Sequence, residues 1–334
     1  MKILIVRVGA MGDVLHALPA VAALRDARLD WEIDWVVDPR WAPLLVDGEG
    51  RGPVVNRVYI AETKLWTKSP VSFATLRSIR ALRKALRRGR YDLVVDMQGT
   101  LRSAVIGWMA GAREFVGYRD PREGLAAKFY SRTVGRRGVH VVEQGVALLG
   151  EACGMSLEPG AVDLPQEQWA DAWAEELVGG RNLVLLAAGA GWGAKRWPAE
   201  RFGALATEMR ALGLSAVVNA SRADDALAAK VVARSGGAAE MVVCNVAGLI
   251  ALMRRVSVLV GGDSGPMHLA AALGIPVVAL FGPTDPARNG PWGVGAHVVI
   301  RNPRSVTSYK RVEADAGLAG VSVDEVVEAV RRVV

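Results

Sequence analysis

Asp13 is the residue whose position best suits acid–base chemistry, because it ends a glycine turn between an apolar strand and a helix. Residues 2–8 are typical of a buried parallel strand, residues 9–13 read Gly-Ala-Met-Gly-Asp, and residues 14–26 have a helical pattern. Small residues let such a turn pack closely, so Gly12 could approach a ligand and Asp13 could take a proton. An Asp here could equally cap the helix, and the local sequence leaves both roles open.

A second strand-to-helix turn is suited to binding phosphate. Residues 261–268 read Gly-Gly-Asp-Ser-Gly-Pro-Met-His, with Ser264 at the cap position and Pro266 in the first turn of a helix. The free N–H groups and the dipole of that helix would hold a diphosphate. A plain capped helix with a structural histidine is the alternative. The candidate contacts are Asp263, Ser264, Gly265, Pro266, Met267 and His268.

A third glycine turn is followed by a cation. Gly189, Ala190 and Gly191 come after a predicted strand, and Lys195 follows them closely. The ammonium group of Lys195 could neutralise a departing phosphate, although a solvent-exposed lysine is the alternative. The isolated cysteines, Cys153 and Cys244, share no metal-type spacing with the histidines, so we expect neither a disulfide framework nor a zinc site.

The elements that must position these turns alternate between strands and helices. Such alternation predicts an α/β fold with parallel sheets. Asp38 ends the second predicted strand and could contact the ribose of a dinucleotide, so a nicotinamide-dependent oxidoreductase remains a second interpretation. The remaining predicted strands are residues 32–37, 57–60, 92–96, 182–187, 215–218, 241–243, 256–260 and 276–281.

Composition and charge restrict the choice of partner. The 334 residues favour two domains, and the proline- and glycine-containing stretch near residue 160 divides the chain into 1–160 and 161–334. The net charge of +7 suits nucleic acid, an acidic membrane or a phosphorylated substrate. We do not expect nucleic acid, because the cations lack aromatic stacking partners in a groove pattern.

A strongly basic amphipathic helix is predicted over residues 72–90. Its apolar residues keep helical spacing, while six arginines and lysines between residues 77 and 88 fill the other face. A solvated helix face is one interpretation, and docking to anionic lipid head groups is the other. The sequence has no apolar run of about 18 residues that would predict a membrane span.

Four ordered motifs give the chain a resemblance to the ADP-heptose:lipopolysaccharide heptosyltransferases, within which it is most similar to the first heptosyltransferase (glycosyltransferase family 9). These motifs are MGDVLH at 11–16, KRWP at 195–198, DSGPMH at 263–268 and FGPTDP at 281–286. The resemblance implies the GT-B architecture, in which two facing Rossmann-like domains enclose a cleft. It implies that residues 1–160 bind the acceptor and residues 161–334 bind the nucleotide-sugar.

The same resemblance assigns roles to residues. Asp13 would be the general base of a single inverting displacement that moves L-glycero-D-manno-heptose from ADP-heptose to the Kdo region of Kdo-lipid A. Lys195 and the turn at 263–268 would stabilise the departing diphosphate without a cofactor or an obligatory metal. The family usually has a ribose-binding Glu near residues 219–224, where this chain offers only Asp224 as a substitute.

The resemblance also suggests how the acceptor is bound and where the protein acts. Lys64, Lys68 and Arg122 are candidate ligands for Kdo carboxylates or lipid A phosphates, since such anions need paired cations. We expect a cytoplasmic protein, peripheral to the anionic cytoplasmic face of the inner membrane. A family member with another acceptor, either a second core heptose or a protein side chain, is the same-fold alternative.

Overall fold

A parallel sheet with the strand order β3-β2-β1-β4-β5-β6 forms the centre of the first half of the chain in the computed structural model, which describes residues 1–308 and 316–334. Helices α3 and α4 pack against each other, and so do α1 and α5. The strands are β1 (Lys2–Val6), β2 (Glu32–Val37), β3 (Arg57–Ile60), β4 (Leu93–Asp96), β5 (Glu114–Tyr118) and β6 (Arg132–Val134). The helices are α1 (Met11–Ala27), α2 (Thr63–Lys68), α3 (Phe73–Gly89), α4 (Leu101–Ala110) and α5 (Val141–Cys153), with short 3₁₀ helices η1 (Pro39–Leu44) and η2 (Gly124–Phe129).

The second half repeats this plan with a sheet of order β12-β11-β10-β7-β8-β9. The strands are β7 (Leu183–Ala187), β8 (Ser215–Ala220), β9 (Ala239–Val243), β10 (Val258–Gly262), β11 (Val277–Phe281) and β12 (His297–Arg301). The helices are α6 (Gln168–Val178), α7 (Ala199–Ala211), α8 (Ala226–Arg234), α9 (Val246–Met253), α10 (Gly265–Ala272), α11 (Pro286–Asn289), α12 (Ala316–Gly320) and α13 (Val323–Val333), with η3 at Gly193–Lys195.

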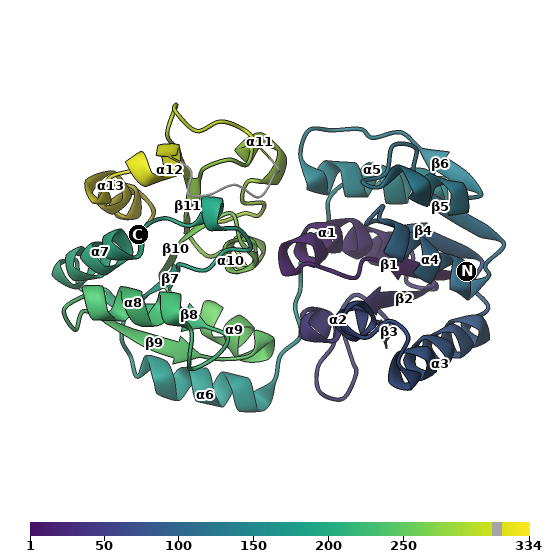
Figure 1. Ribbon diagram of the computed structural model, residues 1–334, viewed down its shortest axis with the longest axis horizontal. Coiled ribbons are helices and arrows are strands. Elements are labelled where there is room, and N and C mark those ends of the chain that lie inside the picture. The colour runs from purple at the N-terminus through teal and green to yellow at the C-terminus, as the bar shows by residue number, and fades with distance from the viewer. Residues whose placement is uncertain (309–315) are drawn as a thin grey trace. The chain divides into compact units, whose positions relative to one another are not determined.

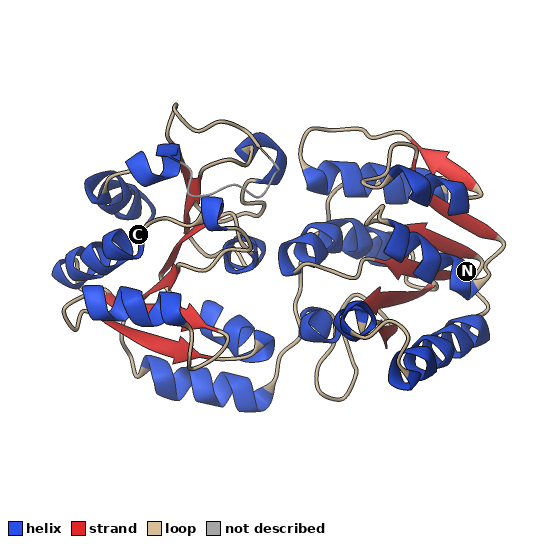
Figure 2. Ribbon diagram, viewed as in Figure 1, coloured by secondary structure: helices blue, strands red, loops and turns tan. Residues whose placement is uncertain are grey.

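The chain divides into two units, Met1–Pro165 and Gln166–Val334. Each unit has its own parallel sheet covered by helices (Figures 1 and 2). The division therefore falls slightly after the boundary that the sequence suggested at residue 160. The predicted α/β class with parallel sheets is confirmed.

Burial explains why the central strands read as unbroken apolar runs. Ile3, Leu4, Ile5 and Val6 of β1 are completely buried, as are the residues of β7, apart from a trace of exposure at Ala187. Helices cover both faces of a parallel sheet of this kind, so neighbouring residues of a strand are equally apolar. Among the described residues, no helix combines the length and the apolar character needed to cross a membrane.

The order of the strands marks one place in each sheet where a ligand is expected. In each sheet the first three strands are added to one side and the next three to the other, so the strand order reverses between β1 and β4 and again between β7 and β10. In open α/β sheets, ligands bind outside the carboxyl ends of the strands at such a reversal. The turn that carries Asp13 follows β1, and the turns that carry Gly189 and Asp263 follow β7 and β10.

Candidate active site

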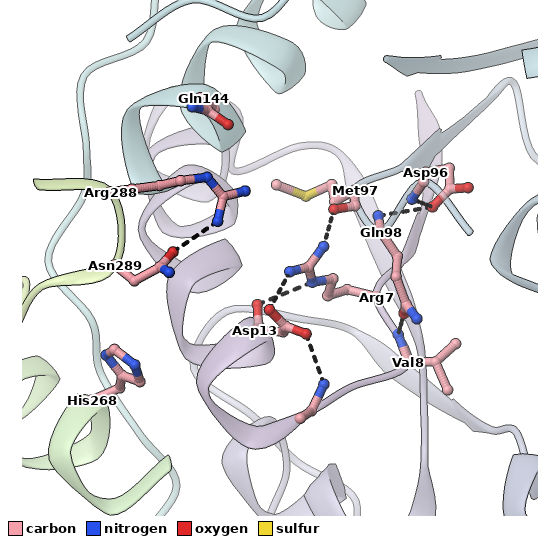
Figure 3. A network of polar contacts seen from close by, with 12 residues as sticks. Arg7, Val8, Asp13, Asp96, Met97, Gln98, Gln144, His268, Arg288 and Asn289 are labelled. Atoms are coloured by element: carbon pink, nitrogen blue, oxygen red, sulfur yellow. Dashed lines mark hydrogen bonds and ion pairs between the residues drawn. The ribbon is translucent and has the colours of Figure 1, made fainter. Parts of the chain in front are cut away.

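Asp13 lies in the first turn of α1, with both carboxylate oxygens in contact with its own unit. The predicted helix began at residue 14, but α1 begins at Met11, with Ala10 at the cap position. The backbone N–H of Ala10 donates to Oδ2 of Asp13 at 3.0 Å, and a guanidinium nitrogen of Arg7 lies 2.8 Å from Oδ1 (Figure 3). The side chain keeps 37% of its surface exposed. Since a carboxylate offers about four acceptor positions, these two contacts leave room for a substrate hydroxyl.

Arg7 is itself held by the loop after β4, and its role was not predicted from the sequence. Its guanidinium donates to the backbone carbonyl of Met97 and, through Nε, to that of Asp13 at 3.2 Å (Figure 3). Its side chain is only 15% exposed. A cation at the end of an otherwise apolar strand was the signal that could have identified it.

The loop after β4 is tied to the end of β1 by a second contact. Oε1 of Gln98 accepts a hydrogen bond from the backbone N–H of Val8 at 2.8 Å, as Figure 3 shows. Asp96 in turn accepts from the backbone N–H groups of Gln98 and Gly99 at 2.8 and 3.0 Å. The loops that follow β1 and β4 therefore form one hydrogen-bonded unit around Arg7 and Asp13.

Asp96 is the buried centre of that loop. Its Oδ2 also accepts from the hydroxyls of Ser103 and Tyr130, at 2.9 and 2.8 Å. Burial raises the pKa of this carboxyl, although the four hydrogen bonds oppose the shift. Its oxygens are occupied by donors of its own unit, so Asp96 supports the site and is not available to a substrate.

The structure places the predicted acceptor ligands on opposite sides of Asp13. Lys64 and Lys68 are exposed on α2, which follows β3, whereas exposed Arg122 follows β5. Four strand-to-strand steps separate β3 from β5, which corresponds to roughly 19 Å across the sheet. The three cations therefore flank the end of β1 and do not form one cluster.

In the second unit, Asp263 joins the two segments that were predicted to bind the donor. Its Oδ2 lies 2.6 Å from Nζ of Lys195, and its Oδ1 lies 3.0 Å from Nε2 of His268. Burial by itself would raise the pKa of Asp263, but the hydrogen bond and charge of His268 and the Lys195 ammonium outweigh it and hold that pKa well below its usual range. Asp263 thus balances the charge of Lys195.

The amino end of α10 offers hydrogen-bond donors beside this ion pair. Ser264 occupies the cap position as predicted, but its hydroxyl makes no capping bond, and Oγ is buried without a hydrogen-bond partner. The backbone N–H groups of Ser264, Gly265 and Met267 are candidate donors, whereas Pro266 has none. The side chain of Met267 is completely buried, so only its backbone could face a ligand.

Gly189, Ala190 and Gly191 follow β7, next to β10. A Cβ atom at Gly189 or Gly191 would meet nothing within 4 Å, so the fold itself does not require glycine at either position. At Gly262 a Cβ atom would lie 2.6 Å from the backbone carbonyl oxygen of Lys195. The carbonyl of Ala190 accepts from Nε and an NH2 group of Arg196 at 3.3 and 3.1 Å.

The two acidic candidates for a ribose contact are both paired within the chain. Asp224 is 71% exposed and forms an ion pair with Arg222 on the loop after β8. Asp38 is buried, and its oxygens accept from Arg40 at 2.7 and 3.0 Å and from the hydroxyl of Thr63 at 3.2 Å. Burial would raise the pKa of Asp38, but the bonds to Arg40 lower it overall. Asp38 therefore organises the start of η1. The dinucleotide interpretation needed a free carboxylate at this position, and the carboxylate of Asp38 is paired within the chain.

The described residues of the two units offer no cluster of side chains for a metal ion. Within residues 1–308 and 316–334, no group of three or more His, Cys, Asp and Glu side chains could hold a metal ion.

Comparison with known proteins identifies the family. The family model described as glycosyltransferase family 9 (heptosyltransferase) matches residues 79–315. The chain belongs to glycosyltransferase family 9. Lys195 and residues 263–268 fall within the matched range, and Asp13 precedes it.

Lipopolysaccharide heptosyltransferases are similar to this chain along most of its length. Lipopolysaccharide heptosyltransferase 1 of Pseudomonas aeruginosa is 34% identical over 301 residues, which are 88% of this chain and 82% of that protein. The Escherichia coli K12 enzyme of the same name is 29% identical over 314 residues, 91% of this chain and 94% of the relative. The structure of E. coli heptosyltransferase WaaC with ADP aligns with a TM-score of 0.80 and 25% identity and covers the whole of both chains.

These findings confirm that the chain is a glycosyltransferase of GT-B type and that the resemblance to heptosyltransferases was correct. The nicotinamide-dependent oxidoreductase is not supported, in agreement with the pairing of Asp38 within the chain.

Proposed function

We propose that this family 9 enzyme transfers L-glycero-D-manno-heptose from ADP-heptose to the Kdo region of Kdo-lipid A, with inversion at the anomeric carbon. The proposal is supported by the similarity to lipopolysaccharide heptosyltransferase 1 of two species and to a heptosyltransferase structure containing ADP. The observation that carries it is the oriented, partly exposed carboxylate of Asp13 beside Arg7 at the carboxyl end of β1.

Asp13 acts as the general base. One of its free acceptor positions takes the proton of the acceptor hydroxyl as that oxygen forms a bond to the anomeric carbon, while the bond from that carbon to the diphosphate breaks. Arg7 holds the carboxylate in position during this step. Lys64, Lys68 and Arg122, which flank Asp13, bind the carboxylates and phosphates of the acceptor.

The second unit binds the donor and stabilises the leaving ADP. The diphosphate lies against the N–H groups of Ser264, Gly265 and Met267 and accepts from the Ser264 hydroxyl. Lys195 contributes a positive charge, which Asp263 balances before the reaction. The attraction of Lys195 for the leaving oxygen strengthens as negative charge develops on that oxygen. The remaining proposed donor contacts are Gly12, Gly189, Ala190, Gly191, Pro266, His268 and Asp224.

The proposed reaction needs neither a cofactor nor an obligatory metal, since the Lys195 cation and the helix donors supply the charge stabilisation. Transfer that continues unchanged in EDTA is the expected result. The basic helix α3 is proposed to hold the enzyme at the cytoplasmic face of an anionic inner membrane, where a lipid-borne acceptor would be found. A second core heptose and a protein side chain remain the alternative acceptors.

The test is ADP release from ADP-heptose with Kdo-lipid A as acceptor, for the wild type, Asp13→Ala and Asp13→Asn. Acceptor-dependent release that falls by roughly 100-fold in both variants would support Asp13 as the general base. Asp26→Asn is the matched control, because Asp26 is exposed near the other end of the same helix. No release by the wild type would exclude this pair of substrates, and release with a different acceptor would favour an alternative.

A further inference from the structure

An apolar stripe runs along the outer face of α4. Leu101, Val105 and Trp108 recur at helical spacing and keep 36%, 37% and 53% of their surface exposed. Apart from Arg102, the other residues of α4 are buried. The outer side of a surface helix is normally polar, so this face is unusual for a helix in contact with water.

The 3₁₀ helix η2 widens the stripe, because it packs alongside α4. At one end the backbone N–H of Leu101 donates to Oε2 of Glu123 at 2.9 Å, and at the other the rings of Trp108 and Phe129 meet edge to face at 6.4 Å. Between these contacts, Leu125 of η2 is 57% exposed. Leu101, Val105, Trp108 and Leu125 are called the apolar stripe below.

The basic helix α3 lies next to α4, on the same face of the sheet (Figure 1). Leu82 and Leu86 of α3 share one core cluster with Ile106 and Met109 of α4, and Nε of Arg87 donates to the carbonyl of Met109 at 3.1 Å. Neither helix contains an acidic residue. The exposed cations of α3 are Arg77, Arg80, Arg83, Lys84, Arg87 and Arg88.

We propose that α3, α4 and η2 form a docking surface for an anionic phospholipid bilayer, in which the apolar stripe enters the acyl region and the α3 cations bind lipid phosphates. A bilayer interface offers hydrocarbon and negative charge close together, which matches an exposed apolar stripe beside a helix without acidic residues. Exposed tryptophan is also favoured at the level of the head groups. The inference rests on the proposed function and deepens it, because a lipid-borne acceptor would be found in such a bilayer.

The test measures binding of the full-length protein to vesicles of phosphatidylethanolamine and phosphatidylglycerol without any acceptor, by co-sedimentation. Val105→Glu and Trp108→Ala should each lower the partition coefficient roughly tenfold, because each removes apolar surface from the membrane. Trp169→Ala is the matched control and should bind like the wild type, since Trp169 on α6 is also 53% exposed. Val105→Glu keeps the ring contact between Trp108 and Phe129. It therefore tests the apolar stripe even if the fold of η2 depends on that contact.

The contribution of the α3 cations is tested by changing the charge of the lipids or the ionic strength. Vesicles of phosphatidylcholine alone, or an ionic strength of about 0.5 M, should weaken binding of the wild type, because the cations lose their partners or are screened. Wild-type binding by both stripe variants would overturn the proposal. Self-association of the wild type that Trp108→Ala abolishes, without vesicle binding, would overturn it in favour of a second copy of the chain.

A second readout separates this proposal from the proposed function. Transfer to a water-soluble, deacylated Kdo acceptor should be unchanged in Val105→Glu and Trp108→Ala, because the stripe acts on the membrane and not on the reaction. If the wild type transfers no heptose but its vesicle binding depends on the stripe, the proposed function fails and the docking surface stands. If transfer occurs and the stripe variants bind vesicles like the wild type, only the proposed docking surface is contradicted.

Discussion

A guanidinium nitrogen of Arg7, at the carboxyl end of β1, lies 2.8 Å from Oδ1 of Asp13, in the first turn of α1. The same guanidinium donates to the carbonyl of Met97, so the position of Asp13 depends on both β1 and the loop after β4. The carboxylate is therefore oriented before any substrate binds. Such preorganisation matters because a misplacement of about 1 Å can cost roughly 100-fold in rate.

Replacement of Arg7 should lower turnover more than substrate affinity. We expect Arg7→Met to reduce kcat by roughly 10- to 100-fold with little change in KM for ADP-heptose, because the base loses its orientation while the donor contacts remain. Steady-state ADP release measures both constants. Arg7→Lys, which keeps a cation able to reach the carboxylate, should recover part of the loss. Wild-type kcat in Arg7→Met would show that the ion pair is not needed for transfer.

The buried pair of Lys195 and Asp263 should matter for stability, unlike the exposed pair of Arg222 and Asp224. Asp263→Ala removes the partner of Lys195, whose charge has little access to solvent. We therefore expect the free energy of unfolding to fall by about 3–5 kcal/mol. Urea unfolding at neutral pH measures this change. Asp224→Ala is the control and should leave unfolding unchanged, because both members of its pair are mostly exposed. Equal effects of the two substitutions would contradict this explanation.

The glycines of the donor turns should separate structural from functional requirements. Gly262→Ala forces a Cβ against the carbonyl of Lys195, and we expect it to cost about 1–3 kcal/mol in the free energy of unfolding. Gly189→Ala meets open space, so unfolding should change by no more than about 0.5 kcal/mol while ADP binding weakens roughly tenfold. Urea unfolding and calorimetric titration with ADP provide the two measurements. Unchanged ADP affinity in Gly189→Ala would remove this glycine from the proposed donor site.

Asp38 should give a pH-dependent contribution to stability. Because its pKa is lower in the folded state than in the unfolded chain, the unfolded state takes up the proton first as the pH falls. The stability advantage over Asp38→Asn should be complete above about pH 4, the ordinary pKa of Asp, and should shrink below it. Urea unfolding of both proteins at several pH values tests the sign. An advantage that grows on acidification would contradict the ion pair with Arg40.

The strands differ in how well local pattern predicted them. Residues 32–37 and 57–60 coincide with β2 and β3, which are rich in aromatic and β-branched residues in spite of the charged Glu32, Asp34 and Arg57. The strands β5, β6 and β12 were missed. β6 has three residues, and β12 is a half-buried edge strand, so their existence depends on pairing with β5 and β11 more than on local sequence.

The start of α1 shows a similar limit. The predicted helix began after Asp13, which left the carboxylate as a cap in front of it, but α1 includes Met11, Gly12 and Asp13. Glycine disfavours helix by about 1 kcal/mol, and packing of the neighbouring apolar residues overrides that preference.

The sequence by itself determined the α/β class, the glycine turns and the family, because apolar runs, turn residues and ordered motifs are local properties of the chain. Only the tertiary structure decided which side chains meet. Val8 contacts Gln98 across 90 positions, and Lys195 reaches Asp263 across 68. Such contacts exist because parallel pairing of β1 with β4 and of β7 with β10 brings the carboxyl ends of distant strands together, and no local pattern encodes that pairing.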